Sequence, residues 1–467
     1  MLTYSLEQIG TYTIYEYLYR CIREDILSKK IKQGDRLPSK RSFARNMQIS
    51  VITVENAYAQ LLAEGYIYSV EKKGYFVNDV ENLNEKSITG TRTKNAVIEE
   101  KNEYFMDFVS NTIDFVNFPL SIWTKLVREI ITTEKSENIL KTSPTGGVMK
   151  LREAISEHLY HFRGMDIEPF RIIIGAGTEY LYNLIIQLLG RQNVFAVEDP
   201  GYSKITEIYR SNDVVCRHIG MDGSGIDMNG LNRYDPDVIH ITPSHHFPTG
   251  IVMPVSRRYE ILNWASEKGS RYIIEDDYDS EFRLSGRPIP ALQSIDMNEK
   301  VIYINTFSKS LAPSIRISYM VLPKHLITEF NRKLGFYSCT VPNFEQYILS
   351  EFIARGYFEK HINRMRNHYR SKRDRILETV KNSALGPHVE IEEEDSGLHF
   401  LLHIHTGMPD DEVAAKAKKI GINISAISQY YYNKTDAREH LFIINYSGID
   451  INRIEEAISM LTKLLFG

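Results

Sequence analysis

The sequence predicts two folded units: a small α+β domain at the N-terminus and a larger α/β domain with a mostly parallel sheet, which ends in a smaller α+β lobe. Three observations predict this organisation. The 467 residues exceed one ordinary domain. Helical periodicity followed by a hairpin pattern fills residues 13–78, and strand-like apolar runs alternate with helical stretches farther on. We therefore place the first domain at 1–78, a polar linker at 79–105 and the larger domain at 106–467.

Within the first domain, residues 40–65 predict two helices joined by a short corner. The second helix extends from Ser50, as its N-cap, to Gly65, as its stop. Its apolar stripe has the spacing of an amphipathic helix and consists of Val54, Ala57, Tyr58, Leu61 and Leu62. A shorter helix over Lys40–Met47 precedes it, and Gln48 and Ile49 suit the corner of a helix-turn-helix.

A hairpin with a basic tip is predicted after the second helix. Its strands are Tyr66–Val70 and Tyr75–Val77, joined by Glu71–Gly74. Residues 29–77 contain nine lysines and arginines against four acidic residues, a local basic patch in a chain whose net charge is −4. Periodicity alone leaves a plain three-helix bundle with a solvated charged face as an open alternative.

The larger domain begins with strands that alternate with helices. Five apolar runs predict the strands: Arg171–Gly175, Val194–Glu198, Val238–Thr242, Tyr272–Glu275 and Val301–Asn305. From about Asn343 a long helical segment is predicted through Lys381. Strands over Leu398–His403 and Leu441–Tyr446 then predict the smaller lobe.

Composition and charge exclude several classes of protein. Hydrophobic residues make up 43% and charged residues 25%, as in a folded protein. Cys21, Cys216 and Cys339 are far apart, so we expect neither a disulfide framework nor a zinc cluster. The first ten residues lack a basic region followed by an apolar run, and no stretch approaches 18 uninterrupted apolar residues. We therefore expect a cytoplasmic protein without membrane segments.

The N-terminal motifs resemble a known DNA-binding domain. The string GDRLPSKR at 34–41, with the later TV, AY and LAEG steps at 53–54, 57–58 and 62–65, resembles the GntR family of bacterial transcriptional regulators. The resemblance implies a winged helix-turn-helix that binds double-stranded operator DNA. Side chains in the first turns of a recognition helix reach base edges, whereas flanking cations bind phosphate. The DNA-binding residues implied are Lys40, Arg41, Arg45, Ser50, Thr53, Asn56, Lys73 and Gly74.

A lysine follows the last predicted strand of the sheet. Lys309 alone would be interpreted as a solvated surface cation. However, the preceding strand ends at Asp276 and Tyr278. An aldehyde cofactor that forms a Schiff base with lysine needs an acid partner on its pyridinium nitrogen and a donor beside its phenolic oxygen. Asp276 and Tyr278 can supply both.

Other residues at strand ends suit a phosphate group. Gly177 and Thr178 lie between a strand and a helix that runs to Leu189, so they would present free backbone N–H groups at a helix N-terminus. Ser308 and Arg316 flank Lys309 and can complete the phosphate cup.

Two further strand ends offer residues for the cofactor ring. Tyr202 can lie over the face of the pyridine, with an ordinary core aromatic as the alternative. His245 or His246 can reach the ring, and the alternative that they are structural turn residues is about equally supported.

Over residues 143–447 these motifs resemble, in order and spacing, the fold-type I pyridoxal-phosphate enzymes of the aspartate aminotransferase superfamily. Joined to a GntR-type head, the domain is similar to the MocR subfamily of regulators. The resemblance implies pyridoxal 5'-phosphate as the cofactor, an internal aldimine at Lys309 and a small-molecule effector. It also implies a head-to-tail homodimer in which each DNA-binding head packs near the large domain of the other subunit.

One position departs from the pattern of that superfamily. Its aminotransferases usually carry an arginine near the end of the small lobe that clamps the substrate carboxylate, but here Ile443 stands at that position and Arg438 is displaced. We therefore expect an effector that is not an amino carboxylate held in the usual way, or pyridoxal phosphate itself. A regulator is favoured over a working aminotransferase with an accessory head. A mere dimerisation scaffold is disfavoured because Lys309, Asp276 and Tyr278 are retained.

Overall fold

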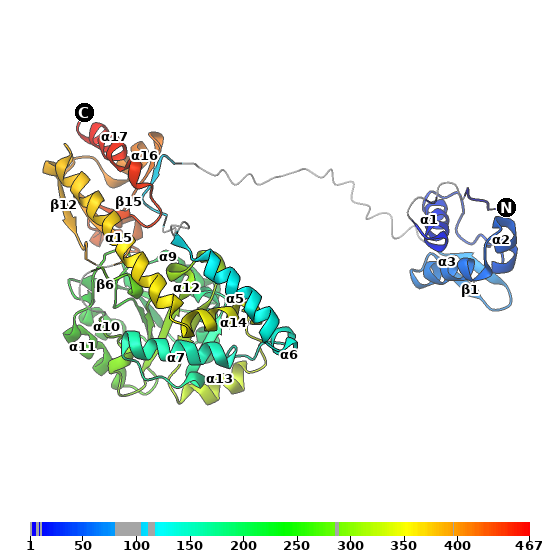
Figure 1. Ribbon diagram of the computed structural model, residues 1–467, viewed down its shortest axis with the longest axis horizontal. Helices are drawn as coiled ribbons and strands as arrows, with labels where there is room; N and C mark the ends of the chain where they lie inside the picture. The colour runs from blue at the N-terminus through cyan, green and yellow to red at the C-terminus, as the bar shows by residue number, and fades with distance from the viewer. Residues whose placement is uncertain are drawn as a thin grey trace. The chain divides into compact units, whose positions relative to one another are not determined.

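The computed structural model describes residues 2–5, 9, 12–79, 104–110, 117–284, 289–395 and 397–467. By its internal contacts the chain divides into two compact units, Met1–Lys101 and Asn102–Gly467 (Figure 1). Most of the predicted linker at 79–105 lies outside the described residues, so the domain boundaries stay predictions. Among the described residues, no helix is both long and apolar enough to span a membrane.

The N-terminal unit consists of three helices and a two-stranded hairpin. These elements are α1 (Ile14–Leu27), α2 (Lys40–Met47), α3 (Val51–Ala63), β1 (Ile67–Val70) and β2 (Gly74–Val77). The corner between α2 and α3 is made by Gln48, which has a left-handed backbone with φ of 55°. Ser50 caps α3 by accepting a hydrogen bond from the Thr53 N–H at 3.1 Å. The predicted winged helix-turn-helix is confirmed.

The larger unit is built on an eight-stranded sheet whose strand order is β4-β11-β10-β9-β8-β5-β6-β7. The strands are β4 (Ile172–Gly175), β5 (Phe195–Asp199), β6 (Cys216–Asp222), β7 (Gly225–Ile226), β8 (Val238–Ile241), β9 (Tyr272–Asp276), β10 (Val301–Thr306) and β11 (Ser318–Val321). Strands β10, β9, β8, β5 and β6 pair in parallel, whereas β11 is antiparallel to both of its neighbours. The predicted mostly parallel sheet is confirmed.

Helices bury both faces of this sheet, which is why its strands are apolar at nearly every position. On β10, Ile302 and Ile304 belong to a core with residues of α8 and α13, while Val301 and Tyr303 belong to cores on the opposite face. The helices of this part are α5 (Leu120–Thr133), α6 (Ser136–Leu140), α7 (Met149–Arg163), α8 (Thr178–Leu189), α9 (Ser203–Ser211), α10 (Met228–Tyr234), α11 (Val255–Ser266), α12 (Phe307–Ser310), α13 (Leu326–Leu334) and α14 (Asn343–Ala354).

The C-terminal lobe is an antiparallel sheet covered by helices, with strand order β12-β13-β16-β15. Its elements are α15 (Tyr357–Asn382), β12 (Val389–Glu392), β13 (His399–Ile404), α16 (Asp410–Lys419), β15 (Ser425–Ala426), β16 (Leu441–Asn445) and α17 (Ile454–Phe466), and the short strands β3 (Met106–Asp107) and β14 (Ile422–Asn423) pair beside it. The long helix α15 runs from the large sheet into the lobe (Figure 1).

The helical segment predicted from about Asn343 to Lys381 is two helices in the structure. Gly356, with φ of 70°, separates α14 from α15. A left-handed residue cannot continue the hydrogen bonding of an α-helix, and glycine adopts that conformation at little cost. The predicted helical segment is therefore interrupted at Gly356.

Because β5, β9 and β10 are parallel, their C-terminal ends meet at one edge of the sheet. Asp199, Asp276 and Thr306 are the last residues of these strands. Ligand sites of open α/β sheets form at this edge.

Candidate functional site

A cavity of about 680 Å³ opens at this edge of the sheet. Its wall combines strand ends, the beginnings of α8 and α9, the α12 region and a segment of the C-terminal lobe. Eight of the nine residues predicted to bind the cofactor line it: Gly177, Thr178, Tyr202, Asp276, Tyr278, Ser308, Lys309 and Arg316. The ninth, His245, does not line it, whereas the neighbouring His246 does.

Lys309 lies in the four-residue helix α12, directly after β10. Burial lowers the pKa of its ammonium group to about 8, although the nearby Asp279 carboxylate acts in the opposite direction. With this pKa about a tenth of the lysine is neutral at pH 7, far more than for an ordinary lysine. The neutral amine is the nucleophilic form, so Lys309 is suited to attack a carbonyl group.

Asp276 ends β9 with its carboxylate buried in the floor of the cavity. The Tyr182 hydroxyl donates a hydrogen bond to Oδ2, and His240 Nε2 lies 3.5 Å from the same oxygen. Oδ1 is buried without any hydrogen-bond partner in the structure. A buried carboxylate oxygen without a partner is costly, so this atom can accept a hydrogen bond from a ligand donor.

The adjacent Asp277 has a structural environment instead. Its Oδ2 lies 2.9 Å from Nη2 of the buried Arg163 and accepts hydrogen bonds from Tyr303 at 2.6 Å and Ser280 at 2.8 Å. Asp277 is not among the residues that line the cavity. Two consecutive carboxylates therefore serve different purposes, one in the cavity and one in a buried ion pair.

Tyr278 lines the cavity, and its hydroxyl contacts His245, which lies outside the cavity lining. The Tyr278 hydroxyl lies 3.2 Å from His245 Nδ1, which in turn lies 2.8 Å from Asp279 Oδ2. Burial raises the pKa of the Tyr278 phenol well above its usual value, and the Asp279 carboxylate adds to this effect. The phenol therefore keeps its proton and can donate it in a hydrogen bond.

The residues of the predicted phosphate cup lie where α8 begins. Gly177 has φ of 94° and precedes the first turn of this helix. This left-handed backbone favours glycine, and a Cβ atom here would lie 2.4 Å from Nη2 of Arg316 and displace that guanidinium. The free N–H groups of a helix N-terminus and a guanidinium form a suitable site for a phosphate.

Glu179 also belongs to this region, and the sequence analysis missed it. Its Oε2 lies 2.6 Å from Nη2 of Arg316, and Lys204 binds its other oxygen. The hydrogen bond from Lys204 is the main cause that lowers the pKa of Glu179. In the sequence, only the position of Glu179 directly after Gly177 and Thr178 could have indicated that it lies beside Arg316.

Glu198, which the sequence analysis did not assign to the site, lies beside His246 at the cavity wall. Glu198 accepts hydrogen bonds from the N–H and the hydroxyl of Thr242 at 2.9 and 3.0 Å, and lies 3.4 Å from His246 Nε2. Burial raises the pKa of Glu198 to about 8 and lowers that of His246 to about 3. At pH 7, Glu198 is therefore mostly protonated and His246 is neutral.

A segment of the C-terminal lobe closes one side of the cavity. The Asp199 carboxylate accepts hydrogen bonds from the backbone N–H groups of Tyr432 at 2.7 Å and Asn433 at 3.1 Å, and the Gly201 N–H donates to the Tyr430 carbonyl at 3.3 Å. These bonds join the end of β5 to residues more than 200 positions away. The sequence carried no signal for this contact.

The predicted DNA-binding residues lie on α2, α3 and the hairpin. Arg41, Arg45, Asn56 and Lys73 have exposed side chains, as contact with DNA requires. Lys40 forms an ion pair of 2.6 Å with Glu55, which leaves its ammonium group partly neutralised. Ser50 caps α3, Thr53 is half-buried in its first turn and Gly74 begins β2 at the wing.

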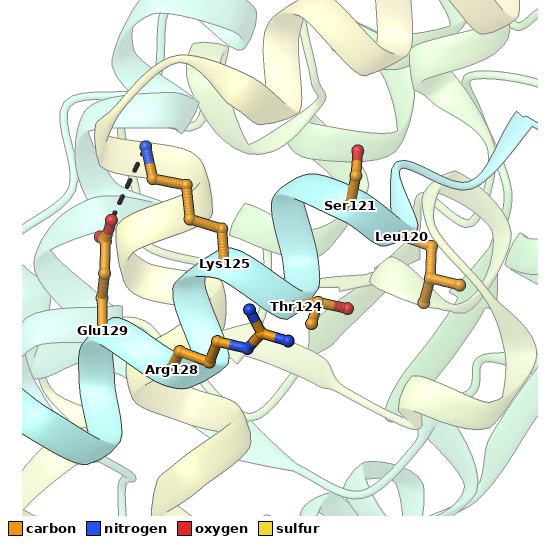
Figure 2. Close-up of a pocket in the computed structure, with 6 residues that line it drawn as sticks. All are labelled: Leu120, Ser121, Thr124, Lys125, Arg128 and Glu129. Atoms are coloured by element: carbon orange, nitrogen blue, oxygen red, sulfur yellow. Dashed lines mark ion pairs between the residues drawn. The ribbon is translucent and has the colours of Figure 1, made fainter.

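A second hollow, of about 510 Å³, lies along the surface of α5 (Figure 2). All six of its lining residues come from this one helix, and Lys125 and Glu129 form an ion pair of 3.7 Å within it. A hollow lined by a single helix cannot enclose a small molecule. The cavity at the sheet edge is therefore the candidate site.

Comparison with known proteins decides the family. Residues 14–77 match the family of bacterial regulatory proteins named gntR, and residues 104–461 match aminotransferase class I and II. The HTH-type transcriptional regulator YdeL of Bacillus subtilis (strain 168) is 37% identical over 450 residues, 96% of each chain. The regulatory protein MocR of Rhizobium meliloti is 28% identical over 471 residues, 98% of this chain and 94% of MocR. The chain belongs to the MocR subfamily of GntR-type transcriptional regulators.

The large domain of this MocR-type regulator has the aminotransferase fold. The kynurenine aminotransferase of Pyrococcus horikoshii superimposes on it with a TM-score of 0.68 and 25% sequence identity, over 78% of this chain and 91% of the enzyme. Aminotransferase domains of this class typically bind pyridoxal phosphate. The resemblance to the MocR subfamily found in the sequence is therefore confirmed.

Proposed function

We propose that this MocR-type regulator binds pyridoxal 5'-phosphate and senses an amine, an amino-acid-like ligand or pyridoxal phosphate itself through covalent attachment of the cofactor to Lys309. The observation that carries the proposal is the pairing, in one cavity, of a lysine whose pKa is about 8 with a buried Asp276 oxygen that has no partner. A chain that used this domain only as a scaffold would have no need for either group.

The residues in the cavity fit the cofactor one by one. Asp276 Oδ1 would accept a hydrogen bond from the ring nitrogen, and Tyr278 would donate to the phenolic oxygen. Tyr202 would stack on the ring, while His245 would act indirectly by holding Tyr278. The phosphate would bind at Gly177, Thr178, Ser308 and Arg316. When bound, the cofactor supplies an aldehyde and an electron-withdrawing ring.

We propose that the head binds a double-stranded DNA operator, which requires a cytoplasmic protein. Arg41, Arg45 and Lys73 would contact phosphates, and Thr53 and Asn56, in the first turns of α3, would contact base edges. Lys40, Ser50 and Gly74 would position these elements on the backbone of the DNA. A head-to-tail homodimer would present two such heads to two half-sites.

Regulation rather than turnover is the proposed use of the large domain. Ile443 stands where an aminotransferase would place a carboxylate-binding arginine, and its side chain is only 2% exposed. Poorly positioned substrates react slowly, so loss of this contact disfavours ordinary transamination. A working aminotransferase with an accessory head is the second candidate, supported by the presence of Lys309, Asp276 and Tyr278 in one cavity.

The first experiment is a visible absorption spectrum of the full-length protein loaded with pyridoxal phosphate, together with footprinting on the DNA upstream of its own coding region. We expect a visible band that disappears in Lys309→Ala and is retained in Lys324→Ala, a matched exposed lysine. A colourless wild-type protein would contradict the cofactor proposal. Footprints unchanged by Arg41→Ala and Thr53→Ala together would contradict the DNA proposal.

A further inference from the structure

The cavity has an aromatic side that the proposed cofactor contacts do not use. Phe247 and residues Gln429–Tyr432 form part of this side. Phe247 packs edge-on against Tyr202, with 6.1 Å between ring centroids, and against Tyr430, with 5.2 Å. Both pairs are nearly perpendicular, with interplanar angles of 87°. These rings form an apolar corner suited to a hydrocarbon or aryl group.

The side chains that pack against these rings are apolar as well. Ile443 on β16 forms a buried cluster with Leu401, Ile427 and Leu441, and the side chains of Phe247, Tyr430 and Tyr431 pack against that cluster. All four aliphatic residues are at most 2% exposed. These four residues carry no charge. The Arg438 cation acts on the Tyr431 phenol that packs against them.

The cations that line the cavity are engaged elsewhere. They are Lys204, Arg210, Lys309 and Arg316. Lys204 and Arg316 both bind Glu179, and Arg210 Nη1 lies 2.8 Å from Glu207 Oε1. Lys309 is the proposed attachment point of the cofactor. None of the four, among the described lining residues, belongs to the aromatic corner.

Arg438 is the nearest arginine to Ile443 in the sequence, but it does not replace a missing cation. Its Nη2 lies 3.1 Å from both carboxylate oxygens of Glu392, and its side chain is 56% exposed. It is not among the residues that line the cavity.

The lining also carries the carboxylates of Glu179, Asp199, Glu207 and Asp276, whereas its fifth acid, Glu198, is mostly protonated at pH 7. A ligand carboxylate in the aromatic corner would lose its hydration without gaining a counter-ion, and it would face these acids. A ligand amine would meet no such penalty.

We propose that the effector is a primary amine with an apolar or aryl body and no carboxylate. This inference rests on the proposed function, in which the amino group meets the cofactor at Lys309. The body of the amine lies against Phe247 and Tyr430, because Tyr202 is the residue proposed to stack on the cofactor ring. Amino acids of the same skeleton carry their carboxylate beside the amino group, and they are rejected because the lining cations Lys204, Arg210 and Arg316 already bind carboxylates.

Calorimetry on the full-length protein loaded with pyridoxal phosphate tests the proposal with pairs that differ by a carboxylate alone. The pairs are 2-phenylethylamine with L-phenylalanine and tyramine with L-tyrosine. Putrescine is a control amine of similar length whose far end is charged instead of aromatic. We expect each arylalkylamine to bind at least about 10-fold more tightly than its amino acid. Equal or tighter binding of the amino acid, equal binding of putrescine, or no binding of either amine at millimolar concentration would each overturn the proposal.

Variants test the corner directly. Ile443→Arg should shift the preference at least about 10-fold toward L-phenylalanine, because it adds a cation behind the corner. Arg438→Ala is the matched control and should leave both affinities unchanged. If thermal unfolding shows that Ile443→Arg does not fold, Phe247→Ala serves in its place. It should weaken 2-phenylethylamine about 10-fold with the visible band retained, and an unchanged affinity would overturn the proposal.

Failure of this inference differs from failure of the proposed function. A protein that stays colourless with pyridoxal phosphate contradicts the proposed function itself. A coloured protein whose band requires Lys309, but which prefers the amino acids, contradicts the amine class alone.

Discussion

Replacing Asp276 by asparagine removes one negative charge from the cavity and leaves the side-chain volume almost unchanged. The Tyr182 hydroxyl can still donate to the amide oxygen, so the unloaded protein keeps that hydrogen bond. The interaction that is lost is the proposed hydrogen bond between the ring nitrogen of the cofactor and the buried carboxylate oxygen of Asp276. A charge-assisted hydrogen bond contributes about 1.5–3 kcal/mol, so we expect the dissociation constant of pyridoxal phosphate to rise roughly 10- to 150-fold.

The assay is a titration of the unloaded full-length protein with pyridoxal phosphate, followed by visible absorbance, with urea unfolding measured in parallel. Asp276→Asn should leave the free energy of unfolding close to that of the wild type. Asp277→Asn is the matched control: it leaves the buried Arg163 guanidinium, 2.9 Å away, without its counter-ion. We expect it to lose about 3 kcal/mol of stability. Wild-type cofactor affinity in Asp276→Asn, or an exchange of the two phenotypes, would refute the reasoning.

Three further predictions concern Lys309, Gly177 and the DNA-binding head. Because the neutral amine reacts and the pKa of Lys309 is about 8, the stopped-flow rate of cofactor attachment should rise about 10-fold per pH unit below pH 8 and then level off; a rise that continues to pH 10 would contradict this. Gly177→Ala should weaken cofactor binding at least about 10-fold, since φ of 94° strains alanine and its Cβ would displace Arg316; Gly223→Ala, with open space around it, should not. Arg41→Ala should weaken binding to all DNA sequences and reduce the magnitude of the salt slope by about one, as measured by fluorescence anisotropy.

The strand-end motifs could be predicted because their physical signal is local. Each short apolar run ends in polar residues, and parallel strands bring those ends to one edge of a sheet. Gly177, Asp276 and Lys309 therefore appear in one cavity although more than 130 positions separate the first from the last. The helix caps were equally local: Ser50 was predicted to begin a helix and does so.

The rest of the cavity depends on contacts that no local pattern encodes. His245 and His246 are adjacent in one turn, and only the path of that turn decides which ring faces the cavity. The segment around Tyr432 is held by Asp199 through backbone N–H groups, which every sequence provides except at proline. The raised pKa of Glu198 comes from burial, and burial is a property of the packed fold.

The Glu179 carboxylate already binds Arg316, the arginine of the proposed phosphate cup. A phosphate that enters the cup must therefore first separate an ion pair and gains only the difference between two anions. Under the proposed function, the cup would hold the cofactor less strongly than a cup with an unengaged arginine. The bound cofactor would then exchange with the supply in solution, and the regulator would respond to changes in that supply.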